Sequence, residues 1–170
     1  MIRFRNLTKS YGTGRGVFDL SFEITDGEVF GLLGPENSGK TTIFSLLLGF
    51  STPGNGWCSV DGRNCHDHAK DLPCQIGYLP EQPEFPTAMT GLQYLRFQTA
   101  VRESKSIEKG IRTAQRLGLN LKGKIAKLSP MDKKKLGIAG ALVHDPRVVL
   151  LDEPTRDLDQ AARHCLAELI

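Results

Sequence analysis

One stretch of eight residues constrains the fold of this chain more than any other part of the sequence. Residues 34–41 read Gly34-Pro35-Glu36-Asn37-Ser38-Gly39-Lys40-Thr41, which fits the pattern G-x-x-x-x-G-K-[ST]. An apolar run at 29–33 precedes this stretch, and a helical pattern at 41–49 follows it. The run is typical of a strand buried on both faces, as in a parallel sheet. A strand, a glycine-containing loop and a helix in this order predict a phosphate-binding loop.

The residue types of this loop suit the chemistry of phosphates. Successive backbone N–H groups and the N-terminus of the following helix would present partial positive charge to the β- and γ-phosphates. Lys40 adds a full positive charge, and Thr41 offers a hydroxyl group to Mg²⁺. The alternative is an ordinary glycine turn with a surface lysine, which the flanking strand and helix patterns disfavour. We therefore expect the chain to bind ATP together with Mg²⁺.

A second strand-like run ends in two acidic residues. Residues 148–151 are apolar, and Asp152 and Glu153 follow them directly. A carboxylate at the end of a buried strand can hold the Mg²⁺ shell, and its neighbour can orient a water molecule. Two adjacent parallel strands would place Asp152 near Thr41. This arrangement predicts Asp152 as a metal ligand and Glu153 as a catalytic group.

The order of elements indicates the fold class. Alternating apolar and polar residues at 18–25 predict a half-buried strand, and further strands are expected at 57–60 and 75–79. Helices are expected from Thr90, over 106–117 with Gly118 as its stop, and over 129–144. We expect an α/β fold, a P-loop NTPase core with a parallel sheet and an inserted helical subdomain. The core would comprise about 1–80 and 145–170, and the helical subdomain about 82–144.

Composition excludes some classes of protein. The chain has 170 residues, enough for one domain, and ordinary contents of hydrophobic (39%) and charged (24%) residues. No apolar run approaches the ~20 residues of a membrane span, and the N-terminal residues do not form a secretory signal. A cytoplasmic location is therefore expected.

Four cysteines, Cys58, Cys65, Cys74 and Cys165, show no C-x-x-C spacing. In a cytosolic domain with a good core, buried free thiols are the expectation. A metal cluster around residues 65–68 is the alternative, although structural zinc sites usually have tighter, paired ligands. His66 and His68 are instead expected on a polar surface loop.

Charge is distributed unevenly along the chain. Residues 102–135 hold eleven Lys or Arg and three acidic residues, a balance of +8 in a chain of net charge +3. A solvated helical surface is the favoured interpretation, ahead of a specific anionic partner. Nucleic acid is not an expected partner, because no recognised binding module accompanies the charge.

Further motifs carry a resemblance to a known family. Residues 150–155 and 158–159 are similar to the Walker B motif and D-loop of the ATP-binding domain of ABC transporters. Residues 77–82 resemble that family's Q-loop, and residues 9–12 its A-loop. The resemblance covers nearly the whole chain, and the motif sequences are most similar to those of the bacterial ABC-2-type exporter ATPases.

The resemblance implies roles for particular residues. Lys40, Gln82 and Glu153 would be catalytic, and Mg²⁺ would be held by Thr41, Gln82 and Asp152. The residues implied to bind the nucleotide are Tyr11, which would stack on adenine, Gly34, Pro35, Glu36, Asn37, Ser38, Gly39, Lys40, Thr41, Thr42 and Ser129.

Partners are implied as well. The ATPase would act as a homodimer or heterodimer, with each nucleotide held between one P-loop and the signature motif of the partner domain. The dimer would drive a separate membrane permease and would lie at the inner face of the cell membrane through that permease.

The signature motif departs from the family pattern. Where the family reads roughly L-S-G-G-Q, this chain has Leu128-Ser129-Pro130-Met131-Asp132. The sequence is a good helix start, with Ser129 as N-cap, Pro130 at the first helical position and Asp132 as in a capping box. Asp132 would put negative charge near phosphate oxygens, and Met131 would add bulk where glycine permits close approach. We therefore expect the helix start to be kept and the contact across the dimer to be weakened.

Other departures lie in the loop and near the end of the chain. Asn37 replaces a common loop glycine, and asparagine tolerates the left-handed conformation better than most residues. Arg156 and Asp157 replace a small pair in the D-loop. The family's switch histidine lies on a later strand, so a fragment and a shortened protein are both compatible with the sequence. His164 is too close to Glu153 to replace that histidine.

Three functions are compatible with these observations. The first is the ATP-binding subunit of an ABC exporter, with ATPase activity impaired in this chain. The second is a nucleotide-binding regulatory or structural module with little or no turnover. The third is a soluble ABC ATPase acting on ribosomes or DNA, which only the basic segment supports.

Overall fold

A computed structural model describes residues 1–35, 37–104 and 106–170. Two units, Met1–Pro73 and Cys74–Ile170, make most of their contacts internally. The expected division into a core of 1–80 and 145–170 and a helical subdomain of 82–144 stays a prediction.

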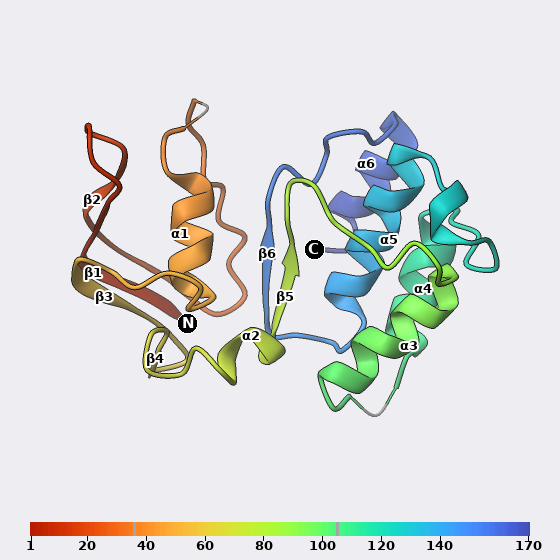
Figure 1. The fold of residues 1–170 in the computed structure, drawn as a ribbon, viewed down its shortest axis with the longest axis horizontal. Helices are drawn as coiled ribbons and strands as arrows, with labels where there is room; N and C mark the ends of the chain where they lie inside the picture. Colours follow the sequence, from red (N-terminus) through yellow and green to blue (C-terminus); the bar gives the residue numbers. More distant parts are fainter. Residues whose placement is uncertain (36, 105) are drawn as a thin grey trace. The chain divides into compact units, whose positions relative to one another are not determined.

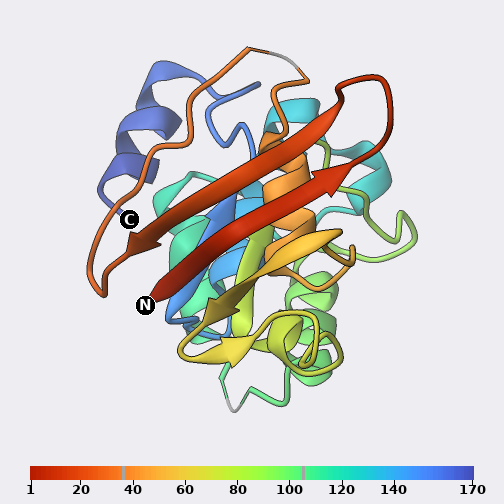
Figure 2. The same ribbon diagram turned by 90° about the vertical axis from the view of Figure 1, so that its left-hand side faces the viewer.

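The first unit is built on a four-stranded antiparallel sheet in the order β2-β1-β3-β4. The long strands β1 and β2 run side by side in Figure 2. Helix α1 packs on this sheet through Ile43, Leu46 and Leu47, which are buried. The strands are β1 (Ile2–Ser10), β2 (Gly16–Ile24), β3 (Asn55–Val60) and β4 (Arg63–Asn64), and the helix is α1 (Lys40–Leu47).

The predicted alternation along β2 is only partly correct. The Phe22 ring stacks on Phe4 with the ring centroids 4.4 Å apart, as expected for an inward side chain. Phe18, however, is 53% exposed, and its neighbour Val17 is buried instead. Asp19 has a φ of 48°, and the pairing with β1 shifts at this point. This bulge places an extra residue in β2 and reverses which face the following side chains occupy.

The strand predicted at 29–33 is wrong. The structure describes these residues without strand pairing, and Val29 and Leu33 are 72% and 94% exposed. Phe30 stacks on Phe22 with centroids 5.1 Å apart, so the segment packs on the sheet through one ring. A strand needs a neighbour that completes its hydrogen bonds, and the order β2-β1-β3-β4 of this unit provides none for 29–33. An apolar run alone therefore did not make a strand.

The second unit holds two parallel strands, β5 (Ile76–Leu79) and β6 (Val148–Leu151), in register. Strand β6 thus has β5 as a parallel neighbour within this unit. Helix α5 packs against β5, α3 and α4, as Figure 1 shows. The helices of this unit are α3 (Gly91–Val101), α4 (Glu108–Arg116), a short 3-10 helix (Ile125–Lys127), α5 (Pro130–Leu142) and α6 (Gln160–Ala167). The short helix α2 (Leu72–Gln75) includes the last residues of the first unit and the first of the second.

Helix boundaries follow the capping residues that the sequence indicates. The Thr90 hydroxyl accepts from the Gln93 amide, and the Gln93 side chain accepts from the Thr90 amide, which completes a capping box. Ser129 caps α5 with Pro130 at its first turn. Gly118 follows α4 with a φ of 68°. These three expectations are confirmed.

Glycine allows α5 to lie directly on β5. A Cβ atom at Gly77 would stand 2.4 Å from the carbonyl oxygen of Ala141, and one at Gly137 would stand 2.6 Å from Leu79 Cδ1. Neither position has room for a side chain, because the first contact is backbone and the second is a core leucine. The strand and the helix therefore pack closely, with Gly77 against the α5 backbone and Gly137 against the Leu79 side chain.

We predict that Gly77→Ala destabilises the protein, because its methyl group overlaps the α5 backbone. The free energy of unfolding should fall by about 1–3 kcal/mol, measured by urea denaturation. Gly123→Ala is the matched control, since a Cβ there meets nothing within 4 Å. Equal unfolding midpoints for the two variants would contradict this account of the strand–helix contact.

We also predict a loss of stability in mild acid. Burial, followed by the nearby Arg102 guanidinium, lowers the pKa of His144 to about 4 from its ordinary 6.5. Because the unfolded chain takes up this proton first, the free energy of unfolding should fall by up to about 3 kcal/mol between pH 6.5 and 4. His144→Asn should flatten that slope in denaturation curves across this range, and His66→Asn serves as the matched control for loss of a histidine. An unchanged slope in His144→Asn would contradict the assignment.

Candidate functional site

The residues expected to form the nucleotide site fall in both units. Tyr11, the loop at 34–41 and Thr42 belong to Met1–Pro73, whereas Gln82, Ser129, Asp152 and Glu153 belong to Cys74–Ile170. Each half has a defined local geometry. The expected proximity of Asp152 to Thr41 stays a prediction.

The loop of the first unit is shaped by two residues with positive φ. Asn37 has a φ of 62°, so the left-handed conformation expected at this position is confirmed. Gly39 has a φ of 97° and forms the N-cap of α1. A Cβ atom at Gly39 would stand 2.9 Å from both the Gly16 carbonyl oxygen and Val17 Cγ2. Only glycine therefore fits the point where the loop meets β2 and the helix begins.

Lys40 is folded back over this loop. Its ammonium group donates to the carbonyl oxygens of Gly34 and Pro35, at 2.7 Å and 2.9 Å. The Ser38 amide also donates to the Pro35 carbonyl, at 3.3 Å. The positive charge predicted for phosphate binding is thus held within the loop. Glu36, which was also expected to bind nucleotide, lies outside the described residues.

The N-terminus of α1 adds to this positive character. The N–H groups in the first turn of a helix have no acceptor within the helix and carry partial positive charge. The first turn of α1 contains no acidic side chain that would offset this charge. Thr41 is exposed and Thr42 is half-buried in this turn. The Lys40 ammonium group and the start of α1 thus supply positive charge at one end of the helix, a cradle of the kind that binds phosphate oxygens.

Tyr11 lies in the turn between β1 and β2, and β2 begins at the Gly16 that contacts Gly39. Its side chain is 57% exposed, and its amide donates to the Arg15 carbonyl at 3.0 Å. Lys9 Nζ lies 5.4 Å from the centroid of the ring. The turn holds the tyrosine by its backbone and leaves much of the ring accessible, as a stacking role requires.

In the second unit, the acidic pair follows β6 as expected. Asp152 is 4% exposed, and its amide donates to the Leu79 carbonyl at 2.9 Å, so it lies beside the end of β5. Burial, followed by the charge of Asp152, raises the pKa of Tyr78. Glu153 is exposed and has a φ of 44°. A left-handed glutamate costs energy and commonly marks a functional site.

Gln82 is exposed in the segment after β5. Its neighbour Glu81 makes several contacts. The Glu81 carbonyl accepts from Lys134 Nζ at 2.7 Å, and the Glu81 carboxylate pairs with Arg156. The start of the predicted Q-loop is thereby tied both to α5 and to the segment after Glu153.

The sequence analysis assigned no role to Glu81 or Lys134, and it noted Arg156 only as a departure in the D-loop. Lys134 is 2% exposed. Burial lowers the pKa of its ammonium group overall, against the opposing effect of the nearby charges of Asp157, Glu81 and Asp152. A signal for its burial was present, because Ile138 and Ala141 follow it at helical spacing on one apolar face. Lys135 is buried too, so the basic segment 102–135 presents less charge to solvent than its count suggests.

The altered signature forms a closed helix cap. The Asp132 amide donates to Ser129 Oγ at 3.1 Å, and the Ser129 hydroxyl donates to the Asp132 carboxylate at 2.9 Å. Met131 was expected to add bulk at the helix end. Its side chain is instead partly buried against the apolar cluster that includes Leu158 and Leu166. Asp132 therefore remains as the electrostatic departure from the family pattern.

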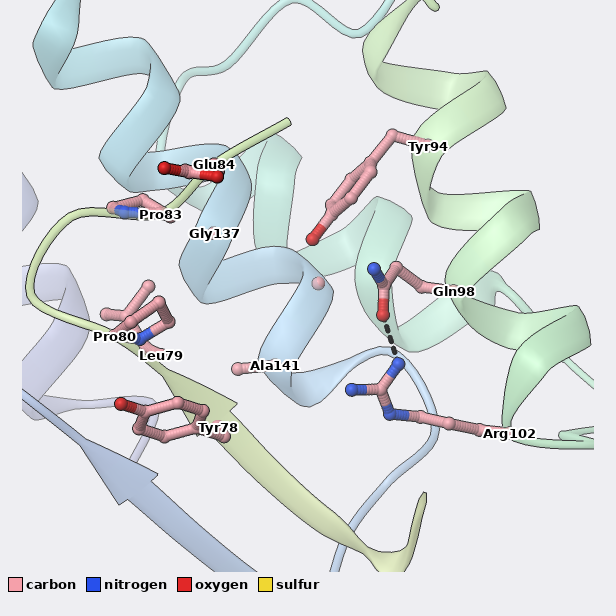
Figure 3. Close-up of a pocket in the computed structure, with 11 residues that line it drawn as sticks. Tyr78, Leu79, Pro80, Pro83, Glu84, Tyr94, Gln98, Arg102, Gly137 and Ala141 are labelled. Atoms are coloured by element: carbon pink, nitrogen blue, oxygen red, sulfur yellow. Dashed lines mark hydrogen bonds between the residues drawn. The ribbon is translucent and has the colours of Figure 1, made fainter. Parts of the chain in front are cut away.

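A separate cavity of about 140 Å³ lies between β5, α3 and α5 (Figure 3). Tyr78 and Tyr94 lie on its wall, and Arg102 donates to Gln98 at its edge. Ligand pockets for molecules of nucleotide size are ~300–1,000 Å³. This cavity is therefore too small to be the nucleotide site, and none of the described residues in the loop at 34–41 lines it.

Three further expectations concern the burial of the cysteines, a metal cluster and membrane spans. Of the four cysteines, Cys58 and Cys65 are buried, Cys165 is half-buried and Cys74 is exposed, so burial of Cys74 is wrong. Among the described residues, no group of three or more His, Cys, Asp or Glu side chains could hold a metal ion. No helix within the described part of the chain is long and apolar enough to cross a membrane.

Comparison with known proteins identifies relatives of this chain. The profile of the family described as ABC transporter matches residues 17–156. The Nod factor export ATP-binding protein I of Rhizobium meliloti (strain 1021) is 36% identical over 168 residues, which are 96% of this chain and 50% of that protein. The protein of the same name from Rhizobium leguminosarum bv. viciae is 37% identical over 98% of this chain and 55% of its own length. The chain thus spans about half the length of the curated relatives it matches.

Solved structures share the fold. The ATP-binding subunit of an ABC transporter superposes with a TM-score of 0.88 at 26% identity, covering 99% of this chain and 72% of that one. A dimeric ABC transporter cassette in a post-hydrolysis state, bound to ADP and Pi, gives a TM-score of 0.82 at 22% identity, covering 99% and 82%. The α/β fold of a P-loop NTPase is confirmed. The chain therefore belongs to the ABC transporter family, as one of its ATP-binding domains.

Proposed function

We propose that this chain is the ATP-binding part of an ABC exporter subunit, which couples ATP binding and hydrolysis to export through a separate membrane permease. The observation that carries the proposal is the Lys40 ammonium group held over the loop carbonyls at the N-terminus of α1. This loop lies inside the region that matches the family. The direction of transport rests on the relatives, which are named as export proteins.

The residues of the first unit fit the phosphates of a nucleotide. Glycine at position 39 lets the loop lie against Gly16 and Val17 of β2, and this backbone would present its amides to phosphate oxygens. Lys40 would exchange its carbonyl partners for phosphate oxygens, a charge-assisted contact. Tyr11 would stack on the base. This set of contacts supports ATP as the ligand.

The donor set for Mg²⁺ is also of the right chemistry. A threonine hydroxyl, a carboxylate and an amide oxygen, from Thr41, Asp152 and Gln82, are hard oxygen ligands that suit this ion. When bound, Mg²⁺ neutralises charge on the phosphates. Glu153 would orient the attacking water, and its exposed position beside Asp152 is compatible with that role.

Partners follow from the same family. A dimer of ATP-binding domains would place the α5 start of one copy, at Ser129, against the nucleotide of the other. Related cassettes have been solved as dimers. Association with the membrane would be peripheral and indirect, through the permease.

The second candidate function is a nucleotide-binding module that hydrolyses ATP slowly. The Asp132 carboxylate accepts a hydrogen bond from the Ser129 hydroxyl at 2.9 Å. In the dimer this carboxylate would bring negative charge toward the phosphates of the partner's nucleotide. Loss of one preorganised contact to developing charge typically costs ~2.7–4 kcal/mol, or about 10²–10³ in rate. We therefore propose that ATP binds well and is hydrolysed slowly.

We predict that Lys40→Ala weakens Mg²⁺·ATP binding by about 1.5–3 kcal/mol, or more than tenfold, because one charge-assisted contact is lost. Titration calorimetry of the folded variant measures this. Lys70→Ala, which removes an exposed lysine of the same unit, should bind ATP as the unchanged protein does. Equal affinities for the Lys40 and Lys70 variants would refute the loop as the phosphate site.

We predict that Asp132→Gln raises ATP turnover by about tenfold, because it removes the negative charge while the Ser129 hydroxyl still caps the backbone amide of residue 132. Steady-state phosphate release measures this rate. Asp132→Glu retains both charge and cap, so its rate should stay low. Adding Glu153→Gln should abolish the turnover that Asp132→Gln restores. Rapid hydrolysis by the unchanged chain would show that the altered signature is not a defect.

A further inference from the structure

Two cysteines face each other in the hairpin formed by β3 and β4. The turn residues Asp61 and Gly62 have φ values of 49° and 77°, as a two-residue hairpin turn requires. Val60 pairs with Arg63, and Ser59 pairs with Asn64. Directly after β4, the Cys65 amide donates to the Cys58 carbonyl at 3.0 Å, which continues this register by one backbone hydrogen bond.

This pairing brings the two side chains to the same face of the hairpin. Directly opposed residues in a hydrogen-bonded antiparallel pair have Cα atoms ~5.5 Å apart. A disulfide bridges Cα atoms that are ~4.4–6.8 Å apart. Residues opposed in this register therefore have a backbone spacing within the range that a disulfide spans.

The thiols are in contact and buried. Cys58 and Cys65 are 3% and 0% exposed. The hydrogen bond between the thiols lowers the pKa of Cys58, and the same bond, followed by burial, raises the pKa of Cys65. Cys58 Sγ also lies 3.5 Å from the carbonyl oxygen of Leu46 in α1. The two thiols are thus hydrogen-bonded to each other, and Cys58 contacts α1, the helix that begins at the phosphate-binding loop.

We propose that Cys58 and Cys65 form a dithiol modification site, which a small-molecule disulfide converts to an intramolecular disulfide. The Cys58 thiolate attacks one sulfur of the oxidant RSSR and displaces RS⁻, giving a mixed disulfide. The deprotonated Cys65 sulfur then attacks the Cys58 sulfur and displaces the second RS⁻. The two cysteines lose two electrons and two protons, and RSSR becomes two RSH.

The position of the hairpin gives the oxidant a route to the buried thiols. Strand β4 has only two residues and lies at the edge of the sheet order β2-β1-β3-β4. Short edge elements open locally at lower free energy than the rest of a fold. Oxidation removes the Cys58 thiol donor to Leu46, and the Leu46 carbonyl still accepts from the Gly49 amide at 3.1 Å. The end of α1 therefore tolerates the modification.

The test uses the chain with Cys74→Ser and Cys165→Ala, which removes the two other thiols. Folded protein is incubated with oxidised glutathione, unfolded, alkylated with iodoacetamide and digested. We expect a loss of about 2 Da, no alkylation at either position, and one linked peptide pair that dithiothreitol separates. Adding Cys65→Ala should abolish the 2 Da loss and leave Cys58 alkylated or carrying glutathione.

Two results would overturn the proposal. One is that both thiols of the folded chain stay reduced and are alkylated after unfolding, which is the behaviour of inert buried cysteines. The other is that the linked peptide forms only when urea is present during oxidation. Circular dichroism of each variant before oxidation confirms that the comparison concerns folded protein.

Discussion

The phosphate-binding half of this protein depends on one backbone contact, between Gly39 and the start of β2. The left-handed conformation at Gly39, with a φ of 97°, turns the loop into α1. The glycine lies so close to Gly16 and Val17 that no side chain fits. The contact fixes where the helix begins, and with it the direction of the first-turn amides and the position of Lys40. Because the turn that carries Tyr11 leads into the same strand, the base-stacking candidate and the phosphate cradle share one anchor.

A comparable main-chain contact organises the second unit. Gly77 and Gly137 allow α5 to lie directly against β5, and the two ends of α5 then occupy defined places. Its N-terminus presents Ser129 and Asp132, and Lys134 donates to the Glu81 carbonyl one residue before Gln82. Arg156 pairs with Glu81 from the segment after Glu153. The residues implied in metal binding and hydrolysis are therefore linked through Glu81, which has no assigned role of its own.

The departures from the family pattern have different physical weights. Asn37 adopts the left-handed backbone that a glycine would otherwise supply, so this replacement preserves the loop. Met131 turns into the apolar cluster of the unit and does not occupy the helix end. Asp132 differs from both, because its charge cannot be hidden by packing and its carboxylate engages Ser129. Electrostatics, more than shape, therefore distinguishes this signature from the family pattern.

The sequence by itself determined the phosphate-binding loop, the ends of α3, α4 and α5, and the place of Asp152 and Glu153 after β6. These features depend on local chemistry, such as a capping hydroxyl, a glycine with positive φ or an acid after an apolar run. Tertiary structure alone decided which strands pair, because hydrogen bonding depends on neighbours distant in sequence. Residues 29–33 have a strand composition but no pairing, whereas β5 and β6 pair across 68 intervening residues. The hydrogen bond from Lys134 to the Glu81 carbonyl and the proximity of Cys58 to Cys65 were likewise set by packing and register, which bring together residues from different elements.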